Sequence, residues 1–211
     1  MMELKKAAAI QRELSSKLIL KWDGRKVDLI AGADFGYDHQ KRKVGACIVV
    51  FRTPDFEIVE ISEAVREVDF SYIPGFLAFR EGPVFFKAFE TLKIMPDVTL
   101  VDGNGIAHPR KMGLASYVGV NLDICTIGCA KKPFSPFSFP KDRKGAYTYF
   151  RNEENEKAGV CLRTRSKIKP IFISPGHRID FKHSMKLVLS CSKFRIPEPV
   201  REAHRRANEI F

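Results

Sequence analysis

Three acidic residues stand where strands or helices are predicted to begin or end in this chain of 211 residues. Asp34 closes an apolar stretch within Ala-Gly-Ala-Asp-Phe-Gly, Asp102 follows the apolar run 98–101, and Glu81 opens a helical pattern. Divalent metals held by carboxylates can activate water, stabilise a leaving oxygen and neutralise phosphate charge, as phosphodiester hydrolysis requires. The three acids together therefore favour a metal-dependent phosphodiesterase.

Each acid also has a purely structural explanation. The segment Asp-Gly-Asn-Gly at 102–105 contains Asn-Gly, the strongest short signal for a hairpin turn. Asp34 lies between two glycines and fits a turn, and Glu81 fits a charge that interacts with the dipole at a helix N-terminus. The position of all three at element ends, in a basic chain, favours the metal.

Histidines are further candidates for metal binding or proton transfer. His108 lies shortly after the second aspartate, His177 closes Ser-Pro-Gly-His, and His204 lies on a predicted terminal helix. His39 lies in a polar turn and is expected to be solvated. Because a lone histidine is more often a hydrogen-bonded structural group than a ligand, none of them identifies a site alone.

The charge balance favours a polyanionic partner. Lys and Arg total 36 against 25 Asp and Glu, which gives a formal net charge of +11. Basic surfaces also occur on proteins that bind no nucleic acid, so this signal is weak alone. A hydrophobic content of 45% over 211 residues is enough for one buried core, and a single domain spanning 1–211 is expected.

The five cysteines do not form a metal-binding or disulfide pattern. Their number is odd, no pair of CxxC motifs is present, and Cys125 and Cys129 lie in an apolar run that predicts buried free thiols. The N-terminus has no uninterrupted apolar segment of a signal peptide, and no apolar run is long enough to span a membrane. We expect a cytoplasmic protein with no membrane partner.

The pattern of apolar residues predicts a mixed α/β fold. The predicted helices are 1–20, 84–92, 112–119, 181–190 and 200–210. The predicted strands are 27–33, 44–51, 56–68, 98–101, 123–129, 147–150, 158–163 and 171–173. The order β-β-β-α-β-α-β with two closing helices is that of a mixed sheet flanked by helices on both faces, as in the ribonuclease H fold. In such a sheet the ends of the first and fourth strands are adjacent, so Asp34 and Asp102 would face each other.

Five segments resemble the endonuclease V family, in the family's order. They are Tyr-Ile-Pro-Gly-Phe-Leu-Ala-Phe-Arg-Glu (72–81), Asp-Gly-Asn-Gly-Ile-Ala-His-Pro-Arg-Lys (102–111), Thr-Ile-Gly-Cys-Ala-Lys (126–131), Ile-Ser-Pro-Gly-His (173–177) and Arg-Ile-Pro-Glu-Pro (195–199). The match spans roughly residues 30 to 210, and the first two motifs are long and unusual in composition.

This resemblance implies a ribonuclease H-like fold and Mg2+-dependent hydrolysis, with Mn2+ as a substitute. The bond cut would be the second phosphodiester on the 3′ side of deoxyinosine or inosine, in DNA repair or in processing of inosine-containing nucleic acid. Asp34, Glu81 and Asp102 match the family's catalytic acids. Lys131 matches a lysine near the scissile phosphate, and His204 matches a histidine that completes the active site. Asp34 and Asp102 would hold metal, with His204 as a third ligand.

The helical position of His204 supports that assignment. At 3.6 residues per turn it falls beside Ala203 and Ala207, on the inward side of the terminal helix. With a ribonuclease H-like order, this helix crosses the ends of the strands that carry the two aspartates. The alternative is a histidine that only hydrogen-bonds the strand ends.

The resemblance also assigns substrate-binding residues: Tyr72, Pro74, Gly75, Leu77 and His108. The tyrosine would fill the space that a base leaves when it turns out of the stack, which costs a few kcal/mol and is cheapest for a weakly paired base. The glycine and leucine would lend backbone groups to the base pocket. The alternative for Tyr72 is an ordinary half-buried loop tyrosine.

Three positions depart from the family's usual residues. Ser71 replaces a frequent proline, Asn104 a frequent glutamine or histidine, and Lys132 a common serine. The loss of proline could loosen the loop around Tyr72, and the extra lysine could strengthen phosphate contacts at the expense of selectivity. None of these changes removes a proposed metal ligand.

Two other functions remain open from the sequence. One is another ribonuclease H-like nuclease, such as a junction resolvase or an RNA–DNA hybrid nuclease, which would use the same carboxylates on a different substrate. The other is a basic nucleic-acid-binding protein without activity, although acids on a phosphate-binding face weaken binding unless a cation offsets them. The expected partner is DNA with deoxyinosine, or inosine-containing RNA. A monomer is compatible with the sequence, which assigns no oligomeric state.

Overall fold

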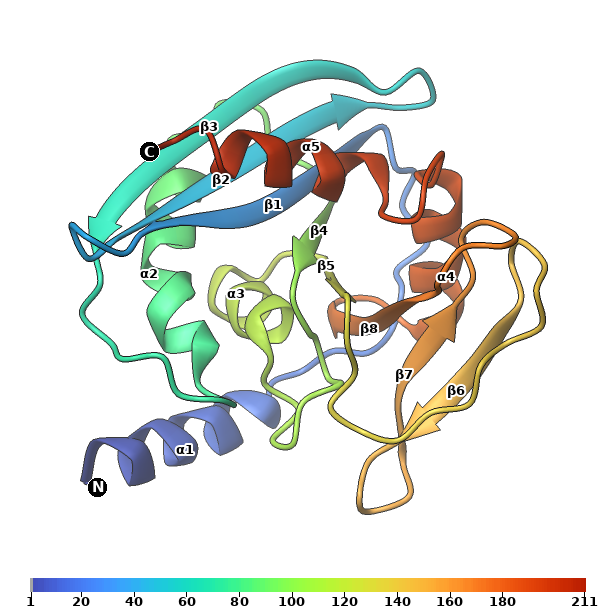
Figure 1. The fold of residues 1–211 in the computed structure, drawn as a ribbon, viewed down its shortest axis with the longest axis horizontal. Helices are drawn as coiled ribbons and strands as arrows, with labels where there is room; N and C mark the ends of the chain where they lie inside the picture. The colour runs from blue at the N-terminus through green and yellow to red at the C-terminus, as the bar shows by residue number, and fades with distance from the viewer. Residues whose placement is uncertain (1) are drawn as a thin grey trace.

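The computed structural model describes residues 2–211 and contains one eight-stranded sheet with helices on both faces (Figure 1). Its strands are β1 (Leu29–Asp38), β2 (Lys43–Arg52), β3 (Glu57–Glu67), β4 (Val98–Asp102), β5 (Thr126–Ala130), β6 (Tyr147–Arg151), β7 (Lys157–Leu162) and β8 (Ile171–His177). Its helices are α1 (Met2–Ser15), α2 (Leu77–Glu90), α3 (Leu114–Leu122), α4 (Phe181–Ser190) and α5 (Glu198–Ala207). None of these helices is both long and apolar enough to cross a membrane.

The strands are ordered β3-β2-β1-β4-β5-β8-β7-β6. β1, β2 and β3 form an antiparallel meander, β1, β4 and β5 are parallel to one another, and β8 returns antiparallel to β5. Parallel neighbours need a crossover, which α2 and α3 supply. This is the ribonuclease H-like arrangement expected from the sequence, and β4 and β5 finish at the same end of the sheet.

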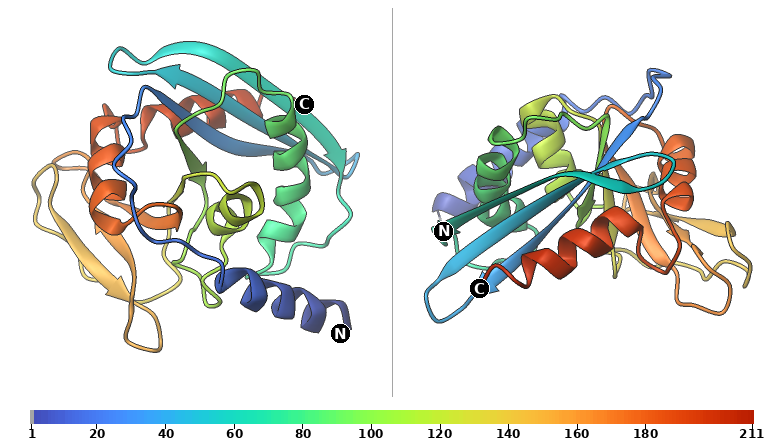
Figure 2. Two further views of the ribbon diagram at one scale, coloured as in Figure 1. Left: turned by 180° about the vertical axis from the view of Figure 1, so that it is seen from behind. Right: turned by 90° about the horizontal axis from the view of Figure 1, so that it is seen from above.

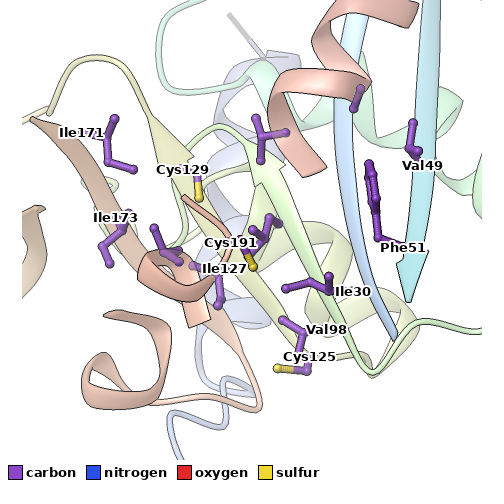
Figure 3. Close-up of a cluster of buried hydrophobic side chains, with 14 of the residues drawn as sticks. Ile30, Val49, Phe51, Val98, Cys125, Ile127, Cys129, Ile171, Ile173 and Cys191 are labelled. Atoms are coloured by element: carbon purple, nitrogen blue, oxygen red, sulfur yellow. The ribbon is translucent and has the colours of Figure 1, made fainter. Parts of the chain in front are cut away.

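Alternating side chains of the central strands fill a separate core on each face. On β1, Ile30 packs with residues of α4 and α5, whereas Ala31 packs with residues of α2 and α3. Figure 3 shows part of the first cluster, in which Cys129 and Cys191 lie among aliphatic side chains. All five cysteines are buried free thiols, which confirms the prediction made for Cys125 and Cys129. Because both faces are covered, polar residues of the central strands can meet a partner only near the strand ends.

β1 is longer than the predicted strand 27–33, so Asp34 does not end it. β2 pairs with β1 over its whole length and places Asp34 opposite Cys47, whereas β4 pairs only with residues 30–33. The alternative of a turn at Asp34 is wrong, because antiparallel pairing with β2 keeps this segment extended. Asp34 therefore lies within β1, just after the last residue that pairs with β4.

Helix α5 lies along β1 on one face of the sheet (Figure 2). A Cβ atom at Gly32 would lie 2.0 Å from the backbone of Pro199, and one at Gly36 would lie 2.0 Å from the carbonyl oxygen of Ala207. No side chain larger than hydrogen fits between strand and helix at these two positions. The two glycines therefore set the height at which α5, and the histidine it carries, lies above β1.

We expect Gly36→Ala to lower the free energy of unfolding by about 3 kcal/mol, because the new methyl group meets backbone that cannot rotate away. Urea unfolding followed by circular dichroism measures this loss. Gly24→Ala is the matched control: Gly24 has a φ of +84° but open space around its Cβ position, so it should lose only about 1 kcal/mol. Equal losses in the two variants would contradict the close approach of α5.

Candidate active site

The parallel pairing of β1 with β4 places two carboxylates side by side. Ala33 is opposite Val101, so the next residue of each strand, Asp34 and Asp102, lies at the same level. Side chains alternate between the two faces of a strand, and this alternation places both carboxylates on the face of the sheet that α5 covers. Asp34 is buried and Asp102 is partly buried. The expectation that these two residues face each other is therefore met by the register of the sheet.

The imidazole of His204 reaches this pair from α5. Its Nδ1 atom lies 2.6 Å from Oδ2 of Asp34, although the two residues are 170 positions apart. The side chain is about half-exposed, while Ala203 and Ala207 beside it are buried, so His204 lies at the border of the inward face rather than within it. One ligand atom each from Asp34, Asp102 and His204 lie within 4.8 Å of one another. Two carboxylates and an imidazole form a donor set that can hold a divalent metal ion.

Lys131 contacts the same cluster from the next strand. It follows β5 directly, and its Nζ lies 2.7 Å from Oδ2 of Asp102. The lysine side chain is about half-exposed, so its ammonium group remains accessible to a ligand. A mobile cation beside a carboxylate can move to a phosphate oxygen when a substrate arrives, which is the position the sequence analysis assigned to it.

Glu81 lies inside α2 and not at its start, which corrects the predicted helix 84–92. The prediction rested on proline at the first helical position, but α2 begins at Leu77, and Pro83 lies within the helix. Gly75, with a φ of +81°, makes the turn that precedes the helix. Proline has no amide hydrogen, so α2 lacks one backbone hydrogen bond at Pro83, but the helix continues on both sides of this residue. Glu81 is consequently buried, so the alternative of a helix N-terminal charge is wrong.

The buried carboxylate of Glu81 has only one of its two oxygens satisfied. Oε1 accepts a hydrogen bond of 2.5 Å from the Tyr37 hydroxyl, whereas Oε2 has no hydrogen-bond partner among the described residues. Burial, followed by the charges of Asp34 and Asp102, raises the pKa of Glu81 to about 8 even though the tyrosine bond opposes this shift. A buried oxygen without a donor, near two other carboxylates, fits a cation.

The pKa of Asp34 also reflects this concentration of negative charge. Burial is the largest cause and the nearby charge of Asp102 the next, and together they raise the pKa of Asp34 to about 7. The backbone amide of Phe35, His204 and Lys131 act in the opposite direction. A bound divalent cation would remove the repulsion and keep both aspartates ionised.

The predicted substrate residues fall into two groups in the structure. Gly75, Leu77 and His108 line a small pocket of about 70 Å³ beside the segment that follows β4. Pro74 is exposed and does not line this pocket. Tyr72 is 68% exposed, so the alternative of a half-buried loop tyrosine is wrong. Its ring is free to stack on a ligand.

The pocket wall is held by a network that includes two residues missed by the sequence analysis. The carbonyl oxygen of Gly75 lies 3.0 Å from Nε2 of His108 and accepts bonds from Arg110 at 2.7 Å and from Gln11 at 3.1 Å. Nδ1 of His108 accepts from the Arg110 amide, so Nε2 carries the proton and donates to Gly75. Burial lowers the pKa of His108 to about 4, and the imidazole is neutral near pH 7.

His177 and His39, the other two histidines considered from the sequence, lie outside this cluster. His177 is buried, accepts a hydrogen bond from the amide of Ile19 and contacts the carboxylate of Asp123, so it ties the segment after α1 to the sheet. His39 is exposed and stacks on Tyr37, with 5.8 Å between ring centroids. His177 therefore has the structural role that a lone histidine more often has.

Comparisons with known proteins cover nearly the whole chain. A family model described as Endonuclease V matches residues 12–205. Endonuclease V of Dictyoglomus turgidum is 47% identical over 197 residues, which are 92% of this chain and 85% of that protein. The crystal structure of endonuclease V from Streptomyces avermitilis has a TM-score of 0.93 at 37% identity and covers 97% of this chain and 91% of that one. A further match is the crystal structure of endonuclease V from Ciona intestinalis in complex with a 23mer DNA containing an inosine followed by a ribo-adenosine. It has a TM-score of 0.89 at 28% identity and covers 99% of this chain and 96% of that one.

Proposed function

Because this chain belongs to the endonuclease V family of phosphodiester-cleaving enzymes, we propose that it is a Mg2+-dependent endonuclease specific for deaminated bases. It recognises deoxyinosine or inosine and hydrolyses the second phosphodiester bond on the 3′ side of that base, in DNA repair or in processing of inosine-containing nucleic acid. Residues 1–211 act as one endonuclease domain. The convergence of ligand atoms from Asp34, Asp102 and His204 within 4.8 Å carries this proposal. The inosine-containing DNA bound by the Ciona protein supports the substrate class.

The protein groups of the site have complementary tasks. Asp34 and Asp102 would hold Mg2+, with Mn2+ as a substitute, and His204 would complete the ligand set or orient the attacking water. Bound Mg2+ would supply Lewis-acid activation of water and neutralise phosphate charge. Lys131 would exchange its contact with Asp102 for the scissile phosphate. Glu81, held by Tyr37, would accept a proton from the attacking water or bind the cation through its free oxygen.

The pocket lined by Gly75, Leu77 and His108 would receive the base. Its volume of about 70 Å³ is small for a purine, so the segments that form it must move apart when a base enters. Neutral His108 and Arg110 both use the carbonyl of Gly75, which fixes the backbone of one wall. The ring of Phe134 meets His108 edge-on at 5.4 Å and covers the pocket from the side of the 131–139 segment.

A cleavage assay on matched strands tests the proposed function directly. Synthetic DNA and RNA strands that differ only by inosine in place of adenosine are incubated with the purified protein in Mg2+, and the fragment ends are mapped. We expect a single cut after the nucleotide that follows inosine, and no cut in the presence of EDTA. Equal cutting of inosine and adenosine strands, or preferential cutting of four-way junctions or RNA–DNA hybrids, would favour another ribonuclease H-like activity.

We expect Tyr72→Ala to weaken binding to a duplex with one inosine more than binding to a single inosine strand. The exposed ring would stack on the bases next to the vacated position, and such stacking is worth about 1–3 kcal/mol. Fluorescence anisotropy with both substrates, in EDTA, measures the two affinities. Tyr147→Ala, which removes another half-exposed tyrosine on β6, is the control and should change neither. An equal loss on both substrates would make Tyr72 a general contact.

A further inference from the structure

An aromatic and basic groove begins directly beside the candidate active site. It has a volume of about 420 Å³ and lies between the segment after β5 and the start of β8. Its lining combines four cationic, three aromatic and two proline side chains: Lys131, Lys132, Lys169, Arg195, Phe137, Phe139, Phe172, Pro133 and Pro170. None of these described lining residues is acidic. We call this feature the Phe139 groove.

The ring of Phe139 is exposed yet supported from below. Its side chain is 68% exposed, and its edge packs against Phe137 with 5.0 Å between ring centroids and 70° between ring planes. Phe137 packs in the same way on Phe172, at 4.7 Å and 77°, and Phe172 is buried. The three rings form a chain of edge-to-face contacts that is anchored in the sheet by buried Phe172. Such a platform can accept a flat ligand without first becoming ordered, which lowers the entropic cost of binding.

Of the four cations around this platform, Lys131 is paired with Asp102, and the other three are not neutralised by carboxylates of the described chain. Within the described chain, neither Lys132 nor Lys169 lies within 4.0 Å of a carboxylate oxygen. Arg195 donates to the carbonyl oxygens of Lys169 and Pro170, so its guanidinium is fixed at the rim while its charge stays unpaired. Exposed aromatic rings beside unpaired cations are the features that bind single-stranded nucleic acid, through base stacking and phosphate contacts.

The topology makes the groove a continuation of the catalytic cluster. β4 and β5 end beside each other, and β8 begins at the same end of the sheet because it is antiparallel to β5, with Phe172 opposite Ala130. Along this end the order is therefore Asp34, Asp102, Lys131 and then the groove. The base pocket, which includes Gly75 and Leu114, lies toward α2 and α3 and shares no lining residue with the groove.

From this order we infer that the Phe139 groove binds the single-stranded nucleotides on the 3′ side of the scissile bond. This inference rests on the proposed function, in which the base enters its pocket on the 5′ side of the cut. The phosphate to be cleaved lies at Asp34 and Asp102, and the strand then continues past Lys131 into the groove. There one base stacks on Phe139, and the following phosphates contact Lys132 and Lys169.

A comparison of strand lengths tests this site kinetically. Single strands with one inosine and equal 5′ arms carry either one or five nucleotides beyond the cut. For the wild-type protein we expect kcat/KM to be at least about fivefold higher with the long arm, mainly through KM, because stacking of one base adds that much affinity. Phe139→Ala should remove most of this difference, leaving the part that the phosphate contacts supply, and should leave the short strand unaffected. Phe211→Ala, which removes a half-exposed phenylalanine outside the groove, should retain it.

A second measurement needs neither metal nor cleavage. 2-Aminopurine is placed at the first, second or third nucleotide beyond the expected cut, and its fluorescence is followed in EDTA. We expect quenching at one of these positions with wild-type protein and with Phe211→Ala, and none with Phe139→Ala. Lys169→Gln should keep the quenching but reduce the slope of log affinity against log salt by roughly 0.7, as expected for one lost phosphate contact on a single strand.

The outcomes separate the groove from the catalytic proposal. Two results would overturn the groove assignment and leave the proposed function intact. One is inosine-dependent cleavage with no effect of the 3′ arm, and the other is an arm effect that is as large in Phe139→Ala as in the wild-type protein. Absence of inosine-dependent cleavage overturns the proposed function. In that case the quenching experiment alone tests whether the groove binds single-stranded nucleotides. Quenching that is unchanged in Phe139→Ala overturns the stacking site. Circular dichroism verifies that Phe139→Ala is folded, as expected for an exposed side chain.

Discussion

Asp102→Ala is expected to reduce the rate of Mg2+-dependent cleavage at inosine by at least about a thousandfold. The carboxylate lies within 4.8 Å of ligand atoms from Asp34 and His204, so its removal leaves an incomplete donor set. Loss of several kcal/mol of charge stabilisation by the metal corresponds to this factor. Binding of the inosine strand should be retained or become tighter, because a negative charge near phosphate disappears and Lys131 loses its partner.

Single-turnover cleavage and anisotropy measurements on the same strand separate these two effects. Asp55→Ala makes the same substitution at an exposed residue in the turn between β2 and β3, and we expect wild-type rates from it. A rate close to wild type for Asp102→Ala in saturating Mg2+ would exclude this residue as a ligand. Loss of binding together with loss of cleavage would indicate a structural role instead.

His204→Ala is expected to lower turnover at saturating substrate by about a hundredfold or more, with KM and stability almost unchanged. The imidazole touches Asp34 at 2.6 Å, but it is half-exposed and contributes little to the core beneath α5. Groups that orient water or transfer protons typically raise the rate by a factor of about 10²–10⁴, and the loss expected for His204→Ala falls in this range. Steady-state kinetics and thermal unfolding of the same preparation measure both quantities.

A second histidine–aspartate pair supplies the matched control. His183 lies 2.8 Å from Asp180 at the start of α4, and both side chains are about one-third exposed. Neither residue belongs to the cluster of Asp34, Asp102 and His204. His183→Ala should keep normal turnover. Normal turnover in His204→Ala, or a variant that simply unfolds, would remove His204 from the proposed catalytic group.

The chain order of strands and helices was enough to place the two aspartates. β1 and β4 become parallel neighbours in the fold that this order predicts, and their register then puts Asp34 beside Asp102. The apolar run at 98–101 also indicated a central strand covered on both faces, because such strands lack polar alternation. These features depend on local patterns and on a small number of permitted topologies.

The parts that sequence reasoning missed depend on contacts between distant segments. Tyr37 resembles any other residue of a strand until α2 brings Glu81 against its hydroxyl. Gln11 lies on the predicted N-terminal helix, where nothing in the local pattern marks it, yet it donates a hydrogen bond to the carbonyl of Gly75. The start of α2 was misplaced because proline favours the first turn of helices in general, whereas this helix continues through it.

The separation of 170 positions between Asp34 and His204 also determines when the site can exist during synthesis. At about 5–20 residues per second, a ribosome needs roughly 10–30 s to extend the chain from the first of these residues to the second. During that interval β1 and β4 can pair, but the apolar face that α5 covers is exposed to solvent or to a chaperone. The nascent chain therefore passes through an inactive, aggregation-prone stage, and the catalytic cluster closes only after residues 198–207 have left the ribosome.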